Sequence, residues 1–257
     1  MPRTLQALKK QTLKLDRIVL INDGSVDKTE EIARNFGAEL INLPYHAVSY
    51  VSDARLDWKM AAALNKGFPV AKCDYFLHLG ADTVLPETYL ERLVSKMEND
   101  PLLVVASGQI EEEPSLRSHV RGSGRLHKTW FWNKHIHRFP LAAGWESYPL
   151  YKARSLGLNV ESFPDIKIVT QRATRLYKAK YGVAMRSYGY FPPFALAKCL
   201  LSILLGKKHG IQLTISYVFP SVHNFLDDGQ IKNWVRLHQI KRLFHLKESA
   251  EIWKKRL

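Results

Sequence analysis

Two carboxylates, Asp23 and Asp82, each follow an apolar run and stand in a glycine-containing turn. The runs are residues 18–21 and 75–79, and a helix-like segment follows each turn. Continuous apolar runs of this length are typical of strands buried on both faces of a parallel sheet. Open α/β sheets hold nucleotides at the carboxyl ends of such strands. The pattern therefore predicts a metal–nucleotide site built from two strand ends.

Three segments, taken in order, resemble one protein family. They are INDGSVDKT at residues 21–29, LNKG at 64–67 and LGADTVLPETYLERLV at 79–94. The set resembles the family 2 glycosyltransferases, which are inverting sugar transferases of the GT-A fold (EC 2.4 class), and it covers about two thirds of the chain. The resemblance implies an α/β fold with a mostly parallel, Rossmann-like sheet flanked by helices.

The resemblance also implies roles for individual residues. The residues that match the nucleotide-sugar-binding turn are Asp23, Gly24, Ser25 and Asp27. Asp82 matches a metal-binding carboxylate, and its hard oxygen ligands suit Mg²⁺ or Mn²⁺. Glu146 matches best the carboxylate that acts as catalytic base. The alternative roles are a turn-stabilising Asp23, an Asp82 that caps its turn and a Glu146 that is only solvated.

Two features depart from the family pattern. The family opens with an apolar strand, whereas residues 1–3 already read as helix, with Leu5 and Leu8 on one face. A buried strand of about five or six residues is therefore expected to be absent. In addition, Gly80 stands where the family has the first carboxylate of its metal motif. Asp82 is left as the single carboxylate of that motif.

The rest of the chain indicates two regions. Strand-like and helix-like segments alternate up to Ala106, which predicts a glycosyltransferase domain over residues 1–176. Within this domain, Pro86 opens a helix whose apolar residues recur every three or four positions and so form one face. Residues 117–139 are rich in His, Arg and Trp without a clear period, and their His spacing does not indicate a metal site. Residues 177–257 are expected to form a helical region.

The C-terminal region combines apolar helices with positive charge. The apolar runs 192–205 and 211–225 are shorter than the roughly twenty residues that span a bilayer. Residues 231–246 show a basic amphipathic pattern typical of interfacial helices. We expect peripheral attachment to an anionic membrane surface; the alternative is a helical appendage packed on the protein itself.

The composition limits the possible binding partners and the cellular compartment of the protein. The chain has 257 residues, a formal net charge of +14 and 46% hydrophobic residues, which indicates a globular protein. It contains no nucleic-acid-binding signature, so the excess charge favours a membrane surface. Two widely spaced cysteines and an N-terminus without an apolar signal-peptide core favour a reducing compartment. We expect a cytoplasmic location on the inner face of the cell membrane.

The expected function is transfer of a sugar from a nucleotide-sugar donor, with inversion, to a glycan or lipid-linked acceptor of the cell envelope. Two alternatives remain open. Gly80 and the missing strand fit a nucleotide-sugar-binding protein without turnover. The basic tail fits a membrane-binding module whose α/β core is a scaffold. The sequence does not specify the nucleotide, the sugar or the acceptor.

Overall fold

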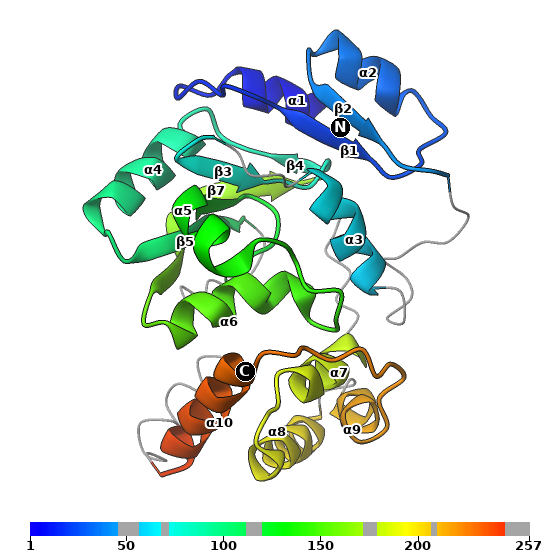
Figure 1. The fold of residues 1–257 in the computed structure, drawn as a ribbon, viewed down its shortest axis with the longest axis vertical. Helices are drawn as coiled ribbons and strands as arrows, with labels where there is room; N and C mark the ends of the chain where they lie inside the picture. The colour runs from blue at the N-terminus through cyan, green and yellow to red at the C-terminus, as the bar shows by residue number, and fades with distance from the viewer. Residues whose placement is uncertain (46–56, 68–71, 112–119, 172–178, 207–209, 245–257) are drawn as a thin grey trace. The chain divides into compact units, whose positions relative to one another are not determined.

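A computed structural model describes residues 1–45, 57–67, 72–111, 120–171, 179–206 and 210–244. The chain divides into two compact units. The first consists of Met1–Val48, Ala62–Phe139 and Lys152–Arg175, and the second of Ser49–Ala61, Pro140–Tyr151 and Leu176–Leu257. The strands of the described residues all belong to the first unit, as Figure 1 shows. The expected domain division after residue 176 stays a prediction.

The first unit alternates short strands with helices. Its strands are β1 (Val19–Asn22), β2 (Glu39–Asn42), β3 (Tyr75–His78), β4 (Thr83–Val84), β5 (Leu103–Ile110), β6 (Arg125–Lys128) and β7 (Asn159–Thr170). The helices before and among them are α1 (Pro2–Lys9), α2 (Thr29–Asn35), α3 (Asp57–Gly67), α4 (Tyr89–Asn99), α5 (Thr129–Phe131), the π-helix η2 (Trp132–Ile136) and α6 (Tyr148–Ser155). The expected α/β class is confirmed.

The strands form two sheets. β1 and β2 pair in parallel, and the five-stranded sheet has the order β3-β6-β5-β7-β4. In the five-stranded sheet only β5 and β7 pair in parallel, whereas β6 runs antiparallel to both of its neighbours and β4 runs antiparallel to β7. The expectation of a mostly parallel sheet is therefore wrong for the described residues: the larger sheet is mixed.

β6, the strand that runs antiparallel to both of its neighbours, does not alternate apolar with polar residues. β6 is buried along its whole length although it includes Arg125 and Lys128. Arg125 donates to the carbonyls of Val120 and Arg121, and the Lys128 Nζ donates to three carbonyls around the end of α4. These bonds offset the cost of removing the cations from water. Because the residues are polar, the usual apolar signal for a buried strand is missing from the sequence.

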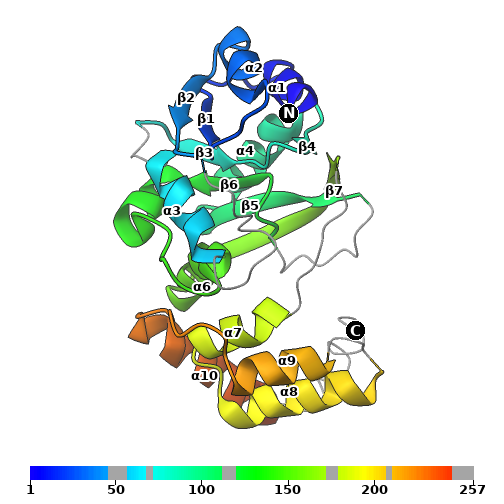
Figure 2. The ribbon, with the colours of Figure 1, turned by 90° about the vertical axis from the view of Figure 1, so that its right-hand side faces the viewer.

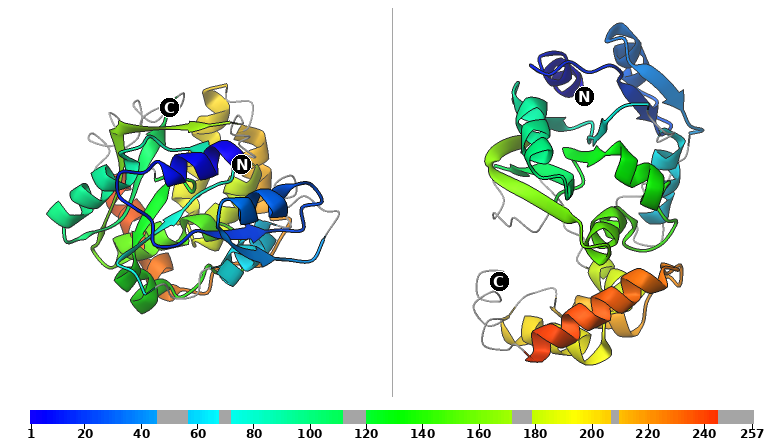
Figure 3. Two further views of the ribbon diagram at one scale, coloured as in Figure 1. Left: turned by 90° about the horizontal axis from the view of Figure 1, so that it is seen from above. Right: turned by 60° about the vertical axis from the view of Figure 1, so that its left-hand side comes forward.

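The longest strand contains an interruption that the sequence does show. Pro164 and Asp165 fall inside β7, where the pairing with β5 jumps from Gly108–Phe163 to Gln109–Lys167. Proline is tolerated in a strand at such a bulge because no ladder hydrogen bond is required there. β7 bends along its length (Figure 3). The bulge lets β7 continue past the proline and pair with β4.

The core of the first unit lies between the five-stranded sheet and the helices α1 and α4. Leu90, Leu93 and Met97 of α4 are buried, which confirms the face expected after Pro86. Leu5 and Leu8 of α1 are buried in the same cluster, so the expected N-terminal helix is also confirmed. This layer of apolar side chains fixes the strand ends that carry the candidate site.

The second unit is helical in the part that the structure describes. Its helices are α7 (Ala179–Ser187), α8 (Pro192–Leu204), α9 (Gly210–Val218) and α10 (Gly229–Phe244), with the short 3₁₀ helix η3 (Trp145–Ser147). α8 and α9 lie side by side (Figure 2) and share a core with α7. Among the described helices, none combines the length and the apolar character needed to cross a bilayer.

The basic helix near the C-terminus uses its apolar face inside the unit. Ile231 and Val235 of α10 are buried beside Tyr188 and Leu226. Trp234 is half-buried and stacks on His238, with ring centroids 5.0 Å apart. These residues of α10 therefore fit the alternative stated above, a helical appendage packed on the protein itself. The exposed apolar side chains of this unit lie mainly on α8 and α9.

Candidate functional site

The turn after β1 is held by a pair of asparagines. Asn22 is buried at the end of β1, and its Nδ2 donates to Asn42 Oδ1, 2.9 Å away at the end of β2. The Asn22 Oδ1 accepts the backbone N–H of Ser25 at 3.0 Å, which closes the turn around Asp23. The sequence carries a signal for this pair, because both strands end in Ile-Asn and the two residues are in register. Asp23 itself is half-buried.

Gly24 allows the turn to pass close to the backbone after β2. Its φ is +73°, and an added Cβ would lie 2.7 Å from the Cα of Tyr45 and 2.9 Å from the carbonyl oxygen of Pro44. An L-residue would therefore face both a left-handed backbone and a clash with atoms that cannot rotate away. The expected turn residues Asp23, Gly24 and Ser25 are thus fixed by backbone geometry as well as by hydrogen bonds.

Asp27 has a structural contact of its own. Its Oδ1 accepts the backbone N–H of Thr29 at 2.9 Å, at the start of α2. The hydrogen bonds from Thr29 lower the pKa of the Asp27 carboxyl. The Glu30 carboxylate accepts hydrogen bonds from Arg34 and Asn42. Asp27 therefore lies just before the N-cap Lys28 and pairs with the first N–H of α2.

The turn that carries Asp82 is fixed from three sides. Thr4 Oγ1 of α1 donates to the carbonyl of Ala81 at 2.9 Å, and the backbone N–H of Gln171 donates to the carbonyl of Asp82 at 2.8 Å. The hydroxyl of Ser123 accepts the N–H of Gly80 at 2.8 Å and lies 2.6 Å from Thr83 Oγ1. Ser123 was not expected, because it comes from the segment before β6 that shows no period.

The residues around Gly80 provide few ligands for a divalent cation. A Cβ at Gly80 would lie 3.0 Å from Asp82 Oδ1 and 3.1 Å from Ser123 Oγ, so these two oxygens closely approach the glycine. Among the described residues, no group of three or more His, Cys, Asp or Glu side chains is placed to hold a metal. Mg²⁺ is commonly bound by one or two carboxylates together with phosphate oxygens and water. One carboxylate at Asp82 fits that arrangement if the diphosphate supplies further ligands.

The Asn-x-Gly sequence at the end of α3 has a physical explanation. Asn65 forms two hydrogen bonds with the backbone of Phe139, from Nδ2 to the carbonyl at 2.9 Å and from the N–H to Oδ1 at 2.8 Å. A Cβ at Gly67 would lie 2.4 Å from Ile21 Cδ1 of β1. α3 is thereby tied to the chain after η2 and packs closely against β1.

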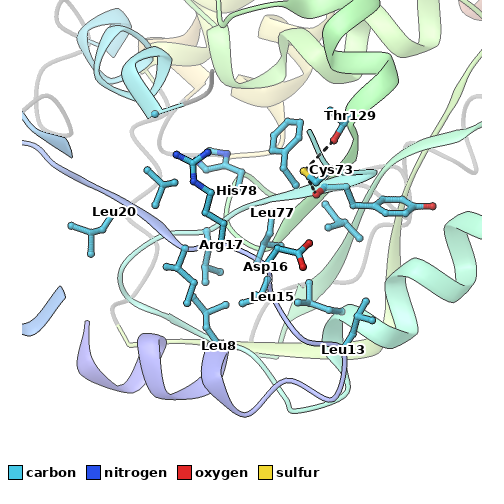
Figure 4. Close-up of a pocket in the computed structure, with 18 of the residues that line it drawn as sticks. Leu8, Leu13, Leu15, Asp16, Arg17, Leu20, Cys73, Leu77, His78 and Thr129 are labelled. Carbon is cyan, nitrogen blue, oxygen red and sulfur yellow. Dashed lines mark hydrogen bonds between the residues drawn. The ribbon is translucent and has the colours of Figure 1, made fainter. Parts of the chain in front are cut away.

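A large cavity separates the two sheets of the first unit. Its volume is about 1070 Å³, and residues 13–21 and 72–81 contribute much of its lining. We call it the β1–β3 slot. Figure 4 shows residues that line it, among them Arg17 and Leu20 from the first of these segments and Cys73 and His78 from the second. The lining extends to Ile21 on one wall and to Gly80 and Ala81 on the other, so the slot reaches both turns.

His78 at the end of β3 and His127 of β6 lie among aromatic rings. The ring of His127 stacks on Phe76 at 4.7 Å, and Trp132 packs edge-on against both. Burial and the nearby Arg125 lower the pKa of His78 to about 3 and hold the pKa of His127 well below its usual range. His127 is therefore a neutral residue packed between these rings.

Glu146 lies in the second unit, on η3. Its side chain is exposed, between the buried Trp145 and the start of α6. Gly144 precedes it with a φ of +83°, and the Gly144 carbonyl accepts the hydroxyl of Tyr188 at 2.8 Å. The structure thus places Asp23 and Asp82 in one unit and Glu146 in the other. The roles of these residues stay predictions.

The fold and the two acidic turns define a GT-A-like α/β protein, and comparison with known proteins identifies its family. The family model for glycosyl transferase family 2 matches residues 1–155. This match covers more than half of the chain, so the chain belongs to that family and to the glycosyltransferase class.

Among curated proteins, the glycosyltransferase EpsJ of Bacillus subtilis is 26% identical over 118 residues, which is 45% of this chain and 32% of that protein. The poly-β-1,6-N-acetyl-D-glucosamine synthase of Staphylococcus epidermidis is 28% identical over 127 residues, 48% of this chain and 28% of that protein. The matches to these relatives therefore span about a third of their length or less.

Two solved structures share the fold. The mannosyltransferase PcManGT of Pyrobaculum calidifontis, in complex with GDP-Man and Mn²⁺, has a TM-score of 0.55 and 15% identity, covering 96% of this chain and 82% of that chain. TarS of S. aureus has a TM-score of 0.52 and 13% identity, covering 86% of this chain and 43% of that chain. At these identities the likeness concerns the fold alone.

Proposed function

We propose that this protein transfers a sugar from a nucleotide-sugar donor to an acceptor hydroxyl or phosphate, with inversion at the anomeric carbon. In this reaction the bond from the anomeric carbon to the diphosphate breaks, a bond to the acceptor oxygen forms and the nucleoside diphosphate leaves. The observation that carries the proposal is the pair of acidic turns, at Asp23 and Asp82, on two strand ends of a family 2 chain.

Each candidate residue has a distinct task in this proposal. Asp23 accepts a hydrogen bond from a base N–H, in a turn whose shape depends on Gly24 and Ser25. Asp27 supports that turn from the start of α2. Glu146 takes the proton from an acceptor hydroxyl on the face of the sugar opposite the diphosphate. An acceptor that is already anionic, such as a lipid phosphate, would need no such base.

A divalent cation, Mg²⁺ or Mn²⁺, would be held by Asp82 and by the diphosphate oxygens. When bound, such an ion neutralises the charge that develops on the leaving diphosphate. The Mn²⁺ in the Pyrobaculum mannosyltransferase complex supports this part of the proposal. The role of this chain is to fix the Asp82 backbone through Thr4, Ser123 and Gln171.

We further propose that the acceptor is a glycan or a lipid-linked precursor at the cytoplasmic face of the membrane. Nine large apolar side chains are exposed on or directly beside α8 and α9: Leu196, Leu200, Ile203, Leu204, Leu205, Ile211, Ile215, Val218 and Phe219. An exposed apolar surface of this kind is typical of a protein or membrane contact. Residues 198–257 contain eleven Lys or Arg against four Asp or Glu, a net charge of +7. This charge favours an anionic lipid surface.

The proposal is tested by measuring nucleoside diphosphate release from a panel of nucleotide sugars that includes GDP-mannose. We expect release in Mn²⁺ and its loss in EDTA. The substitution Asp82→Ala should abolish release with the fold retained, because the hydrogen bonds that hold the turn involve the backbone of residue 82. The matched control is Glu87→Ala, which removes an exposed carboxylate of the same segment.

The outcomes separate the competing functions. Binding of a nucleotide sugar without any release would favour a binding protein without turnover, to which Gly80 points. Absence of binding for the whole panel would favour a membrane-binding module with an α/β scaffold. Full activity of the Asp82→Ala variant in Mn²⁺ would remove Asp82 from the proposal.

A further inference from the structure

The loop that carries Glu146 is bonded to residues much later in the chain. We call residues 141–148 the Glu146 loop, and they belong to the second unit. Asn224, between α9 and α10, forms two hydrogen bonds with this loop. Its backbone carbonyl accepts the N–H of Ala143 at 2.9 Å, and its Nδ2 donates to the carbonyl of Leu141. The start of the Glu146 loop is therefore fixed by the helical part of the chain.

Tyr188, the residue after α7, fixes the middle of the Glu146 loop. Its hydroxyl donates to the carbonyl of Gly144 at 2.8 Å, and the same carbonyl accepts the N–H of Ser147 at 3.0 Å. The bond from Ser147 closes the turn of η3, in which Glu146 lies. A carbonyl oxygen has two lone pairs, so it can accept both bonds at once. The Tyr188 hydroxyl therefore fixes the backbone group that closes the turn around Glu146.

The ring of Tyr188 is packed independently of its hydroxyl. Tyr188 is 2% exposed, and its ring stacks on that of Tyr151 of α6 with the centroids 4.2 Å apart. An added Cβ at Gly144 would lie 2.8 Å from Cε2 of the Tyr188 ring, so the loop passes directly against this ring. Loss of the hydroxyl alone should therefore leave the packing in place.

The end of the Glu146 loop is fixed at the start of α10. The hydroxyl of Tyr148 donates to Asp228 Oδ2 at 3.1 Å, and Asp228 Oδ1 accepts the N–H of Ile231 at 3.0 Å. Burial and the Asp228 carboxylate raise the pKa of Tyr148 to about 12, so its hydroxyl keeps the proton that it donates. Glu146 thus lies between two points of attachment, Gly144 and Tyr148.

We propose that Tyr188 is a positioning residue for Glu146 in the transfer reaction. Through the Gly144 carbonyl, its hydroxyl holds η3 in the conformation in which the Glu146 carboxylate can take the acceptor proton. Proton transfer requires hydrogen-bond distance between base and acceptor oxygen, and a displacement of about 1 Å can cost about a hundredfold in rate. This role of Tyr188 rests on the role proposed above for Glu146. The helical residues of the second unit thereby contribute to catalysis as well as to attachment.

The test is Tyr188→Phe, which keeps the ring and removes the hydroxyl. The measured reaction is release of nucleoside diphosphate from the nucleotide-sugar panel that includes GDP-mannose, with water as the acceptor. We expect kcat to fall by about tenfold or more and KM for the nucleotide sugar to stay unchanged, because Asp23 and Asp82 belong to the first unit. The matched control is Tyr217→Phe, which should keep the wild-type kcat. Tyr217 is a buried tyrosine of α9 that forms no hydrogen bond with the Glu146 loop in the described part of the chain.

A double variant separates positioning from a general effect on the fold. Glu146→Gln should lower kcat by about a hundredfold or more. Tyr188→Phe combined with Glu146→Gln should be no slower than Glu146→Gln alone, because the hydroxyl acts only through the carboxylate. Tyr148→Phe, which loosens the Glu146 loop at its other end, should show the same pattern and provides a second variant.

A wild-type kcat in Tyr188→Phe would overturn the positioning role. Two losses that multiply in the double variant would also overturn it, since Tyr188 would then act independently of Glu146, as a merely structural residue does. If Glu146→Gln alone keeps the wild-type rate, the proposed base is wrong and the role of Tyr188 falls with it. No release from any sugar of the panel by the wild type would refute the transfer reaction itself.

Discussion

At the scale of single residues, Gly24 shows how closely the shape of the candidate nucleotide-binding turn depends on its backbone. Gly24 and Gly37 have nearly equal φ values, +73° and +74°, but a Cβ at Gly37 meets nothing within 4 Å. We predict that Gly37→Ala lowers the free energy of unfolding by about 1 kcal/mol, the cost of a left-handed alanine. Gly24→Ala should cost roughly 2 kcal/mol or more because of the added clash with Pro44 and Tyr45. Urea denaturation measures both changes.

The two variants should also differ in ligand binding. Gly24→Ala is expected to weaken nucleotide binding, since the clash must move the turn that carries Asp23. Gly37→Ala lies beyond α2 and should bind as the wild type does. Equal stability losses in the two variants would contradict the close approach at Gly24.

His78 and His127 predict how stability depends on pH. In the folded protein the pKa values of His78 and His127 are lowered by burial and by Arg125, whereas the unfolded chain takes up these protons near pH 6.5. Below that pH the unfolded state binds more protons, so stability falls as pH falls. The slope is about 1.4 kcal/mol per pH unit for each proton and extends toward pH 3 for His78.

The variant His127→Phe should reduce this slope by about one proton while keeping a ring against Phe76. Chemical denaturation at several pH values between 4 and 7 provides the measurement. His223→Gln, which changes an exposed imidazole, is the control and should leave the slope unchanged. A slope in His127→Phe equal to that of the wild type would show that His127 does not contribute.

At the scale of elements, the sequence predicts those helices and strands whose apolar residues recur at regular spacing. It misses a strand that is held in the core by polar contacts. The apolar face of α4 and the proline bulge of β7 can be read from residue types. β6 cannot, because its burial is made possible by hydrogen bonds from Arg125 and Lys128 to distant carbonyls. Since β6 is antiparallel to its neighbours, missing it also gives the wrong sheet type.

In the candidate site, too, local features can be predicted from the sequence and contacts with distant residues cannot. The acidic turns at Asp23 and Asp82 are visible in the sequence because strand ends and turn residues are local features. Their supports, Asn42 and Ser123, come from elsewhere in the chain. A single sequence does not show which distant side chain reaches a given turn. The site roles themselves stay predictions.

The connection between α3 and the chain after η2 gives a prediction at this scale. Asn65→Ala leaves the N–H and C=O of Phe139 without their partner, which should cost about 1–3 kcal/mol in the free energy of unfolding. Asn99→Ala, at the exposed end of α4, is the matched control and should change stability by less than about 0.5 kcal/mol. If both variants unfold at the same urea concentration, the Asn65 contact has no net stabilising effect.

At the scale of the whole molecule, the exposed apolar residues of α8 and α9 predict membrane attachment. The double variant Leu200→Glu with Ile215→Glu places charge on side chains that are 57% and 54% exposed. Folding should change little, but binding to vesicles of anionic and zwitterionic lipid should weaken by at least about tenfold, because two apolar contacts are lost. Vesicle flotation at low salt measures the effect.

Leu237→Glu is the control for this prediction. Leu237 is 60% exposed but lies on α10 and is not one of the nine apolar side chains on or beside α8 and α9. It therefore introduces the same charge without changing the proposed contact surface. Wild-type protein that stays unbound on anionic vesicles would contradict membrane attachment and favour an acceptor in solution.

The most direct test of the central claim is a calorimetric titration of nucleoside diphosphate into the protein, in Mn²⁺ and in EDTA. We predict metal-dependent binding by the wild type. Asp82→Asn should bind equally weakly in both conditions, because the carboxylate that holds the ion is gone. Asp23→Asn should bind more weakly than the wild type but keep its dependence on Mn²⁺. Wild-type affinity in both variants would contradict the assignment of the site to these two turns.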